Sequence, residues 1–173
     1  NDDDRTTNTE VFAAYSVNVD FMKALNSNHK LFYGVEYIRN DVTSKGLITD
    51  ITNNSSEAGP SRYPQATWAS MAVYINDEYT VSEKFTAQAG LRYNQFKLDA
   101  EFDDTFYPFP FTEANLNNGA LTGSLGGVYR PSDTWVLNTN FGTAFRSPNV
   151  DDIGKVFDSE PGTVTIPNPN LDA

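Results

Sequence analysis

The sequence contains no cysteine and a single histidine, His29, among 173 residues. A disulfide framework, a thiolate metal site and a histidine-rich metal centre are therefore excluded. Cationic residues are also scarce, because 12 Lys and Arg stand against 23 Asp and Glu for a net charge of −11. This balance argues against nucleic acid as a partner, since phosphate binding needs clustered Lys and Arg. Long apolar runs are absent as well, which argues against a membrane-spanning helix but not against a β-barrel, whose strands alternate.

Apolar and aromatic residues are nevertheless plentiful. Hydrophobic residues make up 39% of the chain and aromatic residues 13%, which is too much apolar surface for a disordered acidic tail. In the segment 11–21 they occupy every second position, and the residues between them include Ser16, Asn18 and Asp20. A period of two over about eleven residues predicts a tilted strand that crosses a bilayer. Similar alternation is found in the segments 31–38, 70–78, 85–94, 121–129 and 135–145.

The connections between these segments alternate in length. Short turns are predicted at residues 23–28, 80–84 and 131–134, and long segments at 41–66, 103–119 and from 146 onward. Outer-membrane barrels have short periplasmic turns at one rim and longer extracellular loops at the other. Residues 1–10 would then be the end of an outer loop. The sequence therefore predicts an all-β fold, an antiparallel transmembrane β-barrel segment of about six strands that is part of a larger barrel, because single-chain barrels close with about eight strands or more.

Candidate ligand-binding residues lie in the predicted outer loops. Aromatic residues interleaved with prolines gather in one loop, namely Phe106, Tyr107, Phe109 and Phe111. Charged residues begin the last loop, namely Arg146, Asp151 and Asp152. The aromatic residues fit either contact with a flat or apolar ligand or packing of the loop on itself and on the rim. The charged residues fit either ligand contact or ion pairs that fold the last loop into the lumen.

No catalytic constellation accompanies these residues. The chain has no histidine beside a serine elbow and no phosphate-binding glycine loop, so we predict that it is not an enzyme and expect neither a metal site nor a cofactor. His29 falls in a predicted periplasmic turn, where we expect a solvated residue. Glu36 and Arg92 lie on the polar side of their strands and are expected to line the lumen.

Two short boxes near the end of the sequence carry a family resemblance. The first consists of Phe145, Arg146, Ser147 and Pro148, and the second of Asn168, Pro169, Asn170 and Leu171. Together with the stretches 74–79 and 89–93 they resemble the TonB-dependent receptors of the bacterial outer membrane. Within that family the boxes are most similar to haem and haemoglobin receptors of Bacteroidetes-like bacteria. Two departures are a serine, Ser147, where the family usually has alanine, and the lack of a histidine at 149–167, where such receptors often place one.

The resemblance implies a bacterial outer-membrane receptor for active transport. Residues 1–173 would form part of its β-barrel domain, without the plug domain and the remaining strands. The implied partners are outer-membrane lipid, the rest of the barrel with its plug, the TonB complex, a scarce small-molecule nutrient such as an iron chelate, siderophore or haem, and a surface lipoprotein.

Two alternatives from other classes remain at this point. A passive porin shares the strand and loop pattern but would lack the two boxes. A soluble secreted β-domain that binds carbohydrate through its aromatic loop is the second alternative. The direction of the apolar faces separates them, because these faces point outward in a membrane barrel and inward in a sandwich.

Overall fold

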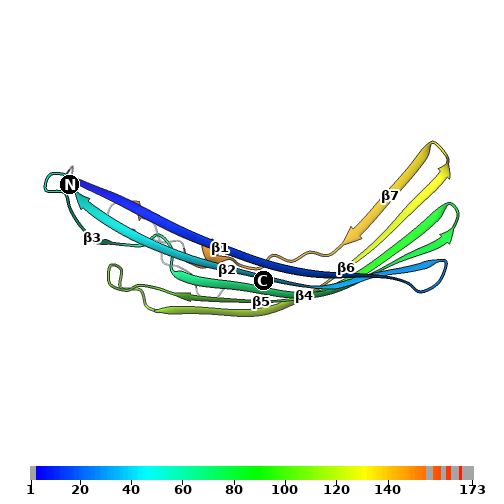
Figure 1. Ribbon diagram of the computed structural model, residues 1–173, viewed down its shortest axis with the longest axis horizontal. Helices are drawn as coiled ribbons and strands as arrows, with labels where there is room; N and C mark the ends of the chain where they lie inside the picture. Colours follow the sequence, from blue (N-terminus) through cyan, green and yellow to red (C-terminus); the bar gives the residue numbers. More distant parts are fainter. Residues whose placement is uncertain (1–2, 155–157, 161–162, 165–167, 169–173) are drawn as a thin grey trace.

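The computed structural model describes residues 3–154, 158–160, 163–164 and 168. Long antiparallel strands dominate it (Figure 1). In the described part of the chain, no helix is long and apolar enough to span a membrane. The elements are β1 (Asp4–Ala24), β2 (His29–Asp50), β3 (Ser55–Gly59), β4 (Gln65–Ser82), β5 (Phe85–Glu101), β6 (Glu113–Ser132), β7 (Trp135–Gly142), α1 (Val150–Gly154), β8 (Asp158–Glu160) and β9 (Thr163–Val164).

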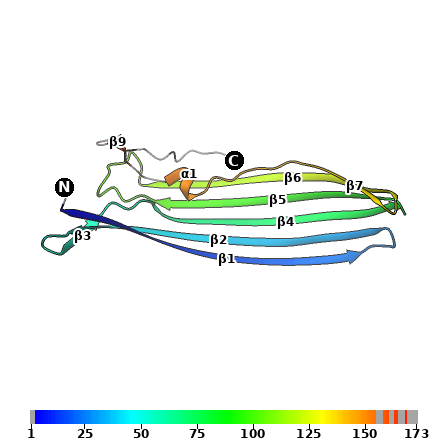
Figure 2. The same cartoon turned by 90° about the horizontal axis from the view of Figure 1, so that it is seen from above.

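The long strands form one curved wall. Its order is β1-β2-β4-β5-β6-β7, and each strand pairs antiparallel with its neighbour. β3 pairs with the C-terminal end of β2. We call this end of the wall, which lies away from the short turns, the upper or loop end. Within the described residues β1 and β7 each leave one edge unpaired, so the wall is open (Figure 2). The prediction of an all-β, antiparallel part-barrel of about six strands is therefore confirmed.

The two faces of this wall differ because side chains alternate along every strand. We call the face against which α1 lies the inner face and the opposite one the outer face. Residues in register across five strands form an apolar row on the outer face, namely Val19, Val35, Val73, Tyr93 and Leu121. Each keeps at least 42% of its surface exposed. Apolar residues thus point outward, as in a membrane barrel and unlike a sandwich.

The predicted long loops are shorter than expected, and this prediction was wrong. Residues 41–50 continue β2, residues 55–59 form β3, and β6 begins at Glu113 rather than after residue 119. Residues 4–10 likewise belong to β1, where Asp4 pairs with Asp50, and not to a loop. The continuation of β2 carries polar residues on both faces. Its alternation is therefore lost from the sequence, although the ladder of hydrogen bonds with β1 continues.

The three short turns are confirmed with tighter bounds. The first follows β1, and in it Asn26 Oδ1 accepts hydrogen bonds from the backbone N–H groups of Asn28 and His29 at 2.8 and 2.9 Å. Such an Asx turn reverses the chain locally. Pro131, which was predicted to begin a turn, instead lies near the end of β6, where the register with β7 shifts. A proline is tolerated at such an irregularity because no ladder bond is lost.

The predicted sixth strand also ends early. Alternation over 135–145 placed Phe145 on the same face as Trp135 and Phe141, but β7 ends at Gly142. Thr143 marks the exit, since its Oγ1 accepts a hydrogen bond from Gly123 N at 2.9 Å while its own N donates to Gly123 O at 2.9 Å. Beyond it the chain leaves the sheet and crosses the inner face toward α1 (Figure 2).

Candidate functional site

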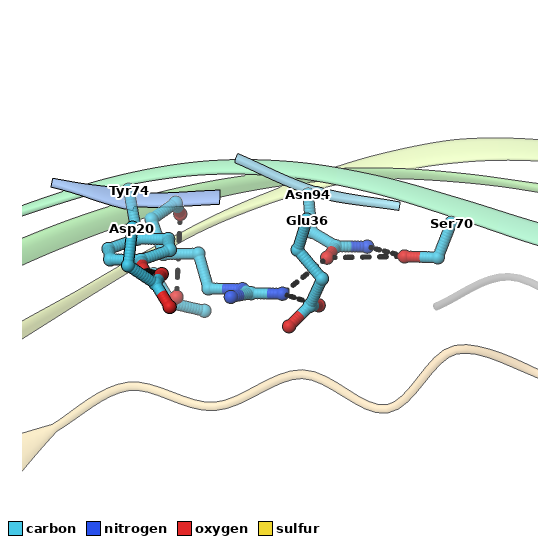
Figure 3. A network of polar contacts seen from close by, with 7 residues as sticks. Asp20, Glu36, Ser70, Tyr74 and Asn94 are labelled. Carbon is cyan, nitrogen blue, oxygen red and sulfur yellow. Dashed lines mark hydrogen bonds and ion pairs between the residues drawn. The ribbon is translucent and has the colours of Figure 1, made fainter. Parts of the chain in front are cut away.

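The middle of the inner face carries a network of polar side chains. Arg92 on β5 donates from Nη2 to Glu36 on β2 and to Asn94 Oδ1, the latter at 3.3 Å. Asn94 in turn exchanges hydrogen bonds with Ser70 at 3.0 and 3.3 Å. Figure 3 shows Glu36, Ser70 and Asn94 on one side of the sheet. The prediction that Glu36 and Arg92 line one polar face together agrees with this arrangement.

A tyrosine links the same network to the first strand. Tyr74 on β4 donates its hydroxyl to Asp20 on β1, although β2 lies between these strands (Figure 3). The ring crosses β2 at Gly34, where an added Cβ would lie 2.6 Å from the Tyr74 hydroxyl and 2.5 Å from Val19 O. Glycine is therefore the residue that fits at this crossing. The polar contacts then tie together four neighbouring strands of the wall.

Toward the loop end the inner face becomes apolar. Leu98 and Ala100 of β5 and Leu116 of β6 are buried beneath α1, whose Ile153 is fully buried. Burial of a side chain of this size contributes about 1.5–3 kcal/mol. The helix is held against the wall mainly by this apolar contact. Other members of the cluster are Ala66, Phe102, Ala114 and Val150, with Val42, Tyr63, Trp68, Phe109 and Phe111 packed against it.

The segment that carries α1 is fixed by polar contacts as well. Asn149 and Asp152 exchange hydrogen bonds between side chain and backbone at 2.9 and 3.0 Å, which is a capping box at the start of the helix. Arg146 forms an ion pair with Asp152, with Nη2 and Oδ1 at 2.6 Å. Asp151 accepts a hydrogen bond of 2.9 Å from the hydroxyl of Tyr63 in the connection before β4. Burial and this bond to a carboxylate raise the pKa of Tyr63, so the hydroxyl stays protonated and donates at neutral pH.

The aromatic loop packs around a phenylalanine that the sequence did not single out. Phe102, just after β5, is buried and meets Phe111 edge-on with ring centroids 5.1 Å apart. Phe109 packs edge-on against Phe102 and stacks on Phe111, while Tyr107 lies tilted against Phe109. Phe106 remains more exposed. The loop therefore folds on itself and on the rim while presenting part of its aromatic surface.

A cavity of about 390 Å³ opens beside this loop. Its walls come from the upper ends of β2 and β3, from the connection before β4 and from the start of the aromatic loop. The lining includes the aromatic residues Tyr63, Phe102 and Phe106 and the charged residues Lys45, Glu101 and Asp103. Such a mixture of aromatic walls and a few polar groups is the usual chemistry of a small-molecule site.

The predicted site residues are thus brought to one end of the wall in two clusters. Phe106, Tyr107, Phe109 and Phe111 share the aromatic loop, and Arg146, Asp151 and Asp152 surround the start of α1. Of the two family boxes, Phe145 stacks on the buried Phe96 with centroids 6.5 Å apart, and Pro148 is buried. Ser147 is half-buried and Asn168 is exposed. Pro169, Asn170 and Leu171 lie outside the described residues.

His29 is not the solvated turn residue that we expected. It begins β2, where Nδ1 lies 2.8 Å from Asp77 Oδ2 and the ring stacks on Tyr79 with centroids 4.2 Å apart. The prediction that it lies in the turn was therefore wrong, because it directly follows the turn and the neighbouring strand supplies Asp77, 48 residues away in the chain, as its partner.

Reasoning from the sequence missed the apolar cluster under α1, although a signal for it exists. In β5 the apolar residues occupy odd positions up to Tyr93 and even positions from Phe96 to Ala100. The same reversal separates Met71 from Trp68 in β4 and Leu121 from Leu116 in β6. The apolar residues thus change from the outer to the inner face in three adjacent strands. This change occurs at the level where α1 and the aromatic loop pack on the inner face.

The fold and the outward-facing apolar band define a membrane-barrel wall. A family model described as "TonB dependent receptor-like, beta-barrel" matches residues 1–173. The chain belongs to this family of TonB-dependent receptor barrels, and not to the porins or to soluble carbohydrate-binding domains.

Comparisons with individual proteins agree with this family. The chain is 23% identical over 149 residues to a probable TonB-dependent siderophore receptor, PiuA, of Acinetobacter baumannii, a match that covers 77% of this chain and 20% of that protein. It thus spans about a fifth of that relative's length.

Two solved structures share the fold. The copper transporter OprC matches with a TM-score of 0.73 at 15% identity over 86% of this chain and 23% of that chain. The ferric citrate transporter FecA in its unliganded form matches with a TM-score of 0.64 at 14% identity over 81% of this chain and 21% of that chain.

Proposed function

We propose that this chain is part of the barrel wall of a bacterial outer-membrane receptor that binds a scarce nutrient outside the cell and takes it up with energy from the TonB complex. The remaining strands, the plug domain and the TonB contact would lie elsewhere in the receptor. Family membership supports the proposal, and so does the exposed apolar outer face, which suits contact with lipid. A surface lipoprotein as a further partner stays a prediction.

The observation that carries the proposed binding role is the convergence of two loops at one end of the inner face. The aromatic loop packs on the same apolar cluster to which α1 contributes Val150 and Ile153, and the cavity of about 390 Å³ lies beside the aromatic loop. We assign ligand contact to Phe106 and Tyr107, because Phe106 lines this cavity and both rings lie at the edge of the aromatic packing. Arg146, Asp151 and Asp152 hold the segment around the start of α1 in place through their ion pair and hydrogen bonds, and they add charged groups to this end of the wall.

The ligand proposed is an iron chelate of the siderophore class. The relative in Acinetobacter baumannii carries that name, and aromatic walls suit the flat or apolar parts of such a molecule. Haem is the second candidate, because of the similarity of the boxes to haem receptors. It is the weaker one, since residues 149–167 contain no histidine.

Growth of a strain that lacks the receptor tests this proposal. The strain would be complemented with the full-length receptor and supplied with a ferric siderophore, ferric citrate or haem as its sole iron source. We expect growth on a ferric chelate, and we expect the double variant Phe106→Ala/Tyr107→Ala to weaken chelate binding by about tenfold, or about 1.4 kcal/mol. Tyr129→Ala, on the outer face, is the matched control and should bind normally. Growth on haem alone would exclude the siderophore assignment, and unchanged binding by the double variant would exclude the aromatic site.

A further inference from the structure

Asp77 of β4 interrupts an apolar region of the outer face. It pairs across the sheet with Leu31 of β2 and Ala89 of β5, so its side chain stands on the same face as theirs. Its neighbours on that face along β4 are Ile75 and Tyr79. An ionisable side chain on a lipid-facing surface costs free energy unless it is paired, which makes it a candidate for a specific role.

The pairing of Asp77 inside the protein is incomplete. Its Oδ2 lies 2.8 Å from His29 Nδ1, and each of the two side chains keeps 33% of its surface exposed. Its Oδ1 is buried and has no hydrogen-bond partner among the described residues, so a donor from outside could reach only Oδ2. Each carboxylate oxygen accepts about two hydrogen bonds, so Oδ2 retains capacity for one donor besides His29.

A shallow apolar groove of about 730 Å³ runs beside this carboxylate on the outer face. Small residues form its floor: a Cβ added at Gly123 would have Leu91 Cδ2 at 3.3 Å and Gly90 O at 3.6 Å as its nearest neighbours. Larger apolar side chains flank this hollow. The lining residues with side chains on this face include Leu31, Ile75, Asp77, Leu91, Leu125 and Phe141.

A cation completes the site. Lys23 of β1 pairs with Leu31, and Leu31 pairs with Asp77, so Lys23 stands on the same face two strands from the carboxylate, about 10 Å away. Lys23 is exposed and has no ion-pair partner in the described part of the chain. The groove is therefore accompanied by one acidic and one basic group, close to the turn that follows β1.

We propose that this groove binds a phospholipid with a primary ammonium head group. An acyl chain would occupy the apolar hollow, the ammonium would donate to Asp77, and the phosphate would lie near Lys23. A primary ammonium offers three N–H donors, whereas the quaternary ammonium of choline offers none. The stacked ring of His29 on Tyr79 lies at the turn end of the strands, where aromatic side chains meet lipid head groups. The inference rests on the proposed membrane location but not on the identity of the nutrient.

Native mass spectrometry of the full-length receptor tests this site. The receptor would be exposed to equal amounts of phosphatidylethanolamine and phosphatidylcholine with identical acyl chains. We expect the wild type to retain the ethanolamine lipid about three- to fivefold more than the choline lipid, the range of a partly exposed ion pair. Asp77→Asn should bring this ratio close to one. Asp99→Asn, which removes another carboxylate of the outer face but lies outside the groove, should leave it unchanged.

A second variant tests the groove itself. Gly123→Leu fills the hollow and should reduce retention of both lipids together. Equal retention of the two lipids by the wild type, a ratio unchanged in Asp77→Asn, or a receptor dimer in place of bound lipid would overturn the proposal. A receptor recovered outside the outer-membrane fraction would contradict the proposed location as well. A receptor that is found in the outer-membrane fraction but retains the two lipids equally would contradict the lipid site alone.

Discussion

The lower part of the wall and its loop end use the same strands in opposite ways. Up to Asn94, the apolar residues of β5 point outward and the inner face is polar, with Arg92 and Asn94 in its network. Above that level Phe96 and Leu98 are fully buried on the inner face, and Lys97 and Asp99 occupy the outer one. At each level, the apolar side chains of such a strand therefore lie on the face that is covered by lipid or by another segment of the protein. We infer that lipid covers the lower outer face, while α1 and the aromatic loop cover the upper inner face.

The largest expected effect comes from comparing two leucines of one strand. Leu98→Ala removes a fully buried side chain from the cluster under α1 and should destabilise the receptor by about 2–5 kcal/mol. Leu91→Ala, on the outer face with 56% exposure, should cost much less. Denaturant unfolding of the full-length receptor in detergent measures both. Equal losses would show that the two levels of β5 do not differ in the way described above.

A smaller effect is expected where Tyr74 crosses β2. Gly34→Ala places a methyl group against the Tyr74 hydroxyl and Val19 O, and the resulting strain should cost about 1–3 kcal/mol. Gly142→Ala is the matched control, because its nearest neighbour would be at an ordinary distance of 3.5 Å. Denaturant unfolding of both variants measures the difference. An unchanged free energy of unfolding for Gly34→Ala would show that the Tyr74 ring does not require a glycine where it crosses β2.

Breaking the central ion pair should have a more modest effect. Glu36→Gln removes the carboxylate facing Arg92, and because both side chains are partly exposed we expect a loss of about 1 kcal/mol. Glu78→Gln, whose Lys30 partner lies 3.8 Å away, is the control and should be nearly neutral. A double-mutant cycle with Arg92→Gln measures the coupling. A coupling energy of zero would show that Glu36 and Arg92 contribute to stability independently of each other.

The smallest effect concerns acidification of the aromatic loop. Hydrogen bonds from Thr105 lower the pKa of Asp103 below its usual value. Because the folded carboxyl has the lower pKa, its stabilising contribution is present above the unfolded pKa and is lost as the pH falls through the folded one. Hydrogen exchange at the Thr105 amide, corrected for its intrinsic pH dependence, should therefore lose protection in acid. Asp103→Asn should show no such dependence, and protection that persists in the acidified wild type would refute this role.

Much of the wall could be predicted from the sequence. Alternation over 11–21 and 85–94 identified strands, the short turns were located within a few residues, and the boxes around Phe145 and Asn168 indicated the family that the comparisons establish. Strand ends were the least accurate part. The stretch 41–50 has polar residues on both faces, and nothing in its pattern distinguishes a ladder that extends beyond the apolar band from a loop.

Which residues share a face follows from the sequence alone, because the period of a strand is local and needs no partner. What covers each face depends on the tertiary structure. Phe145 turned to the inner face because the chain leaves β7 at Gly142, and Asp151 meets the hydroxyl of Tyr63, which lies 88 residues away in the chain. Contacts of this kind depend on where distant segments return to the wall, and the alternation of neighbouring residues carries no information about that return.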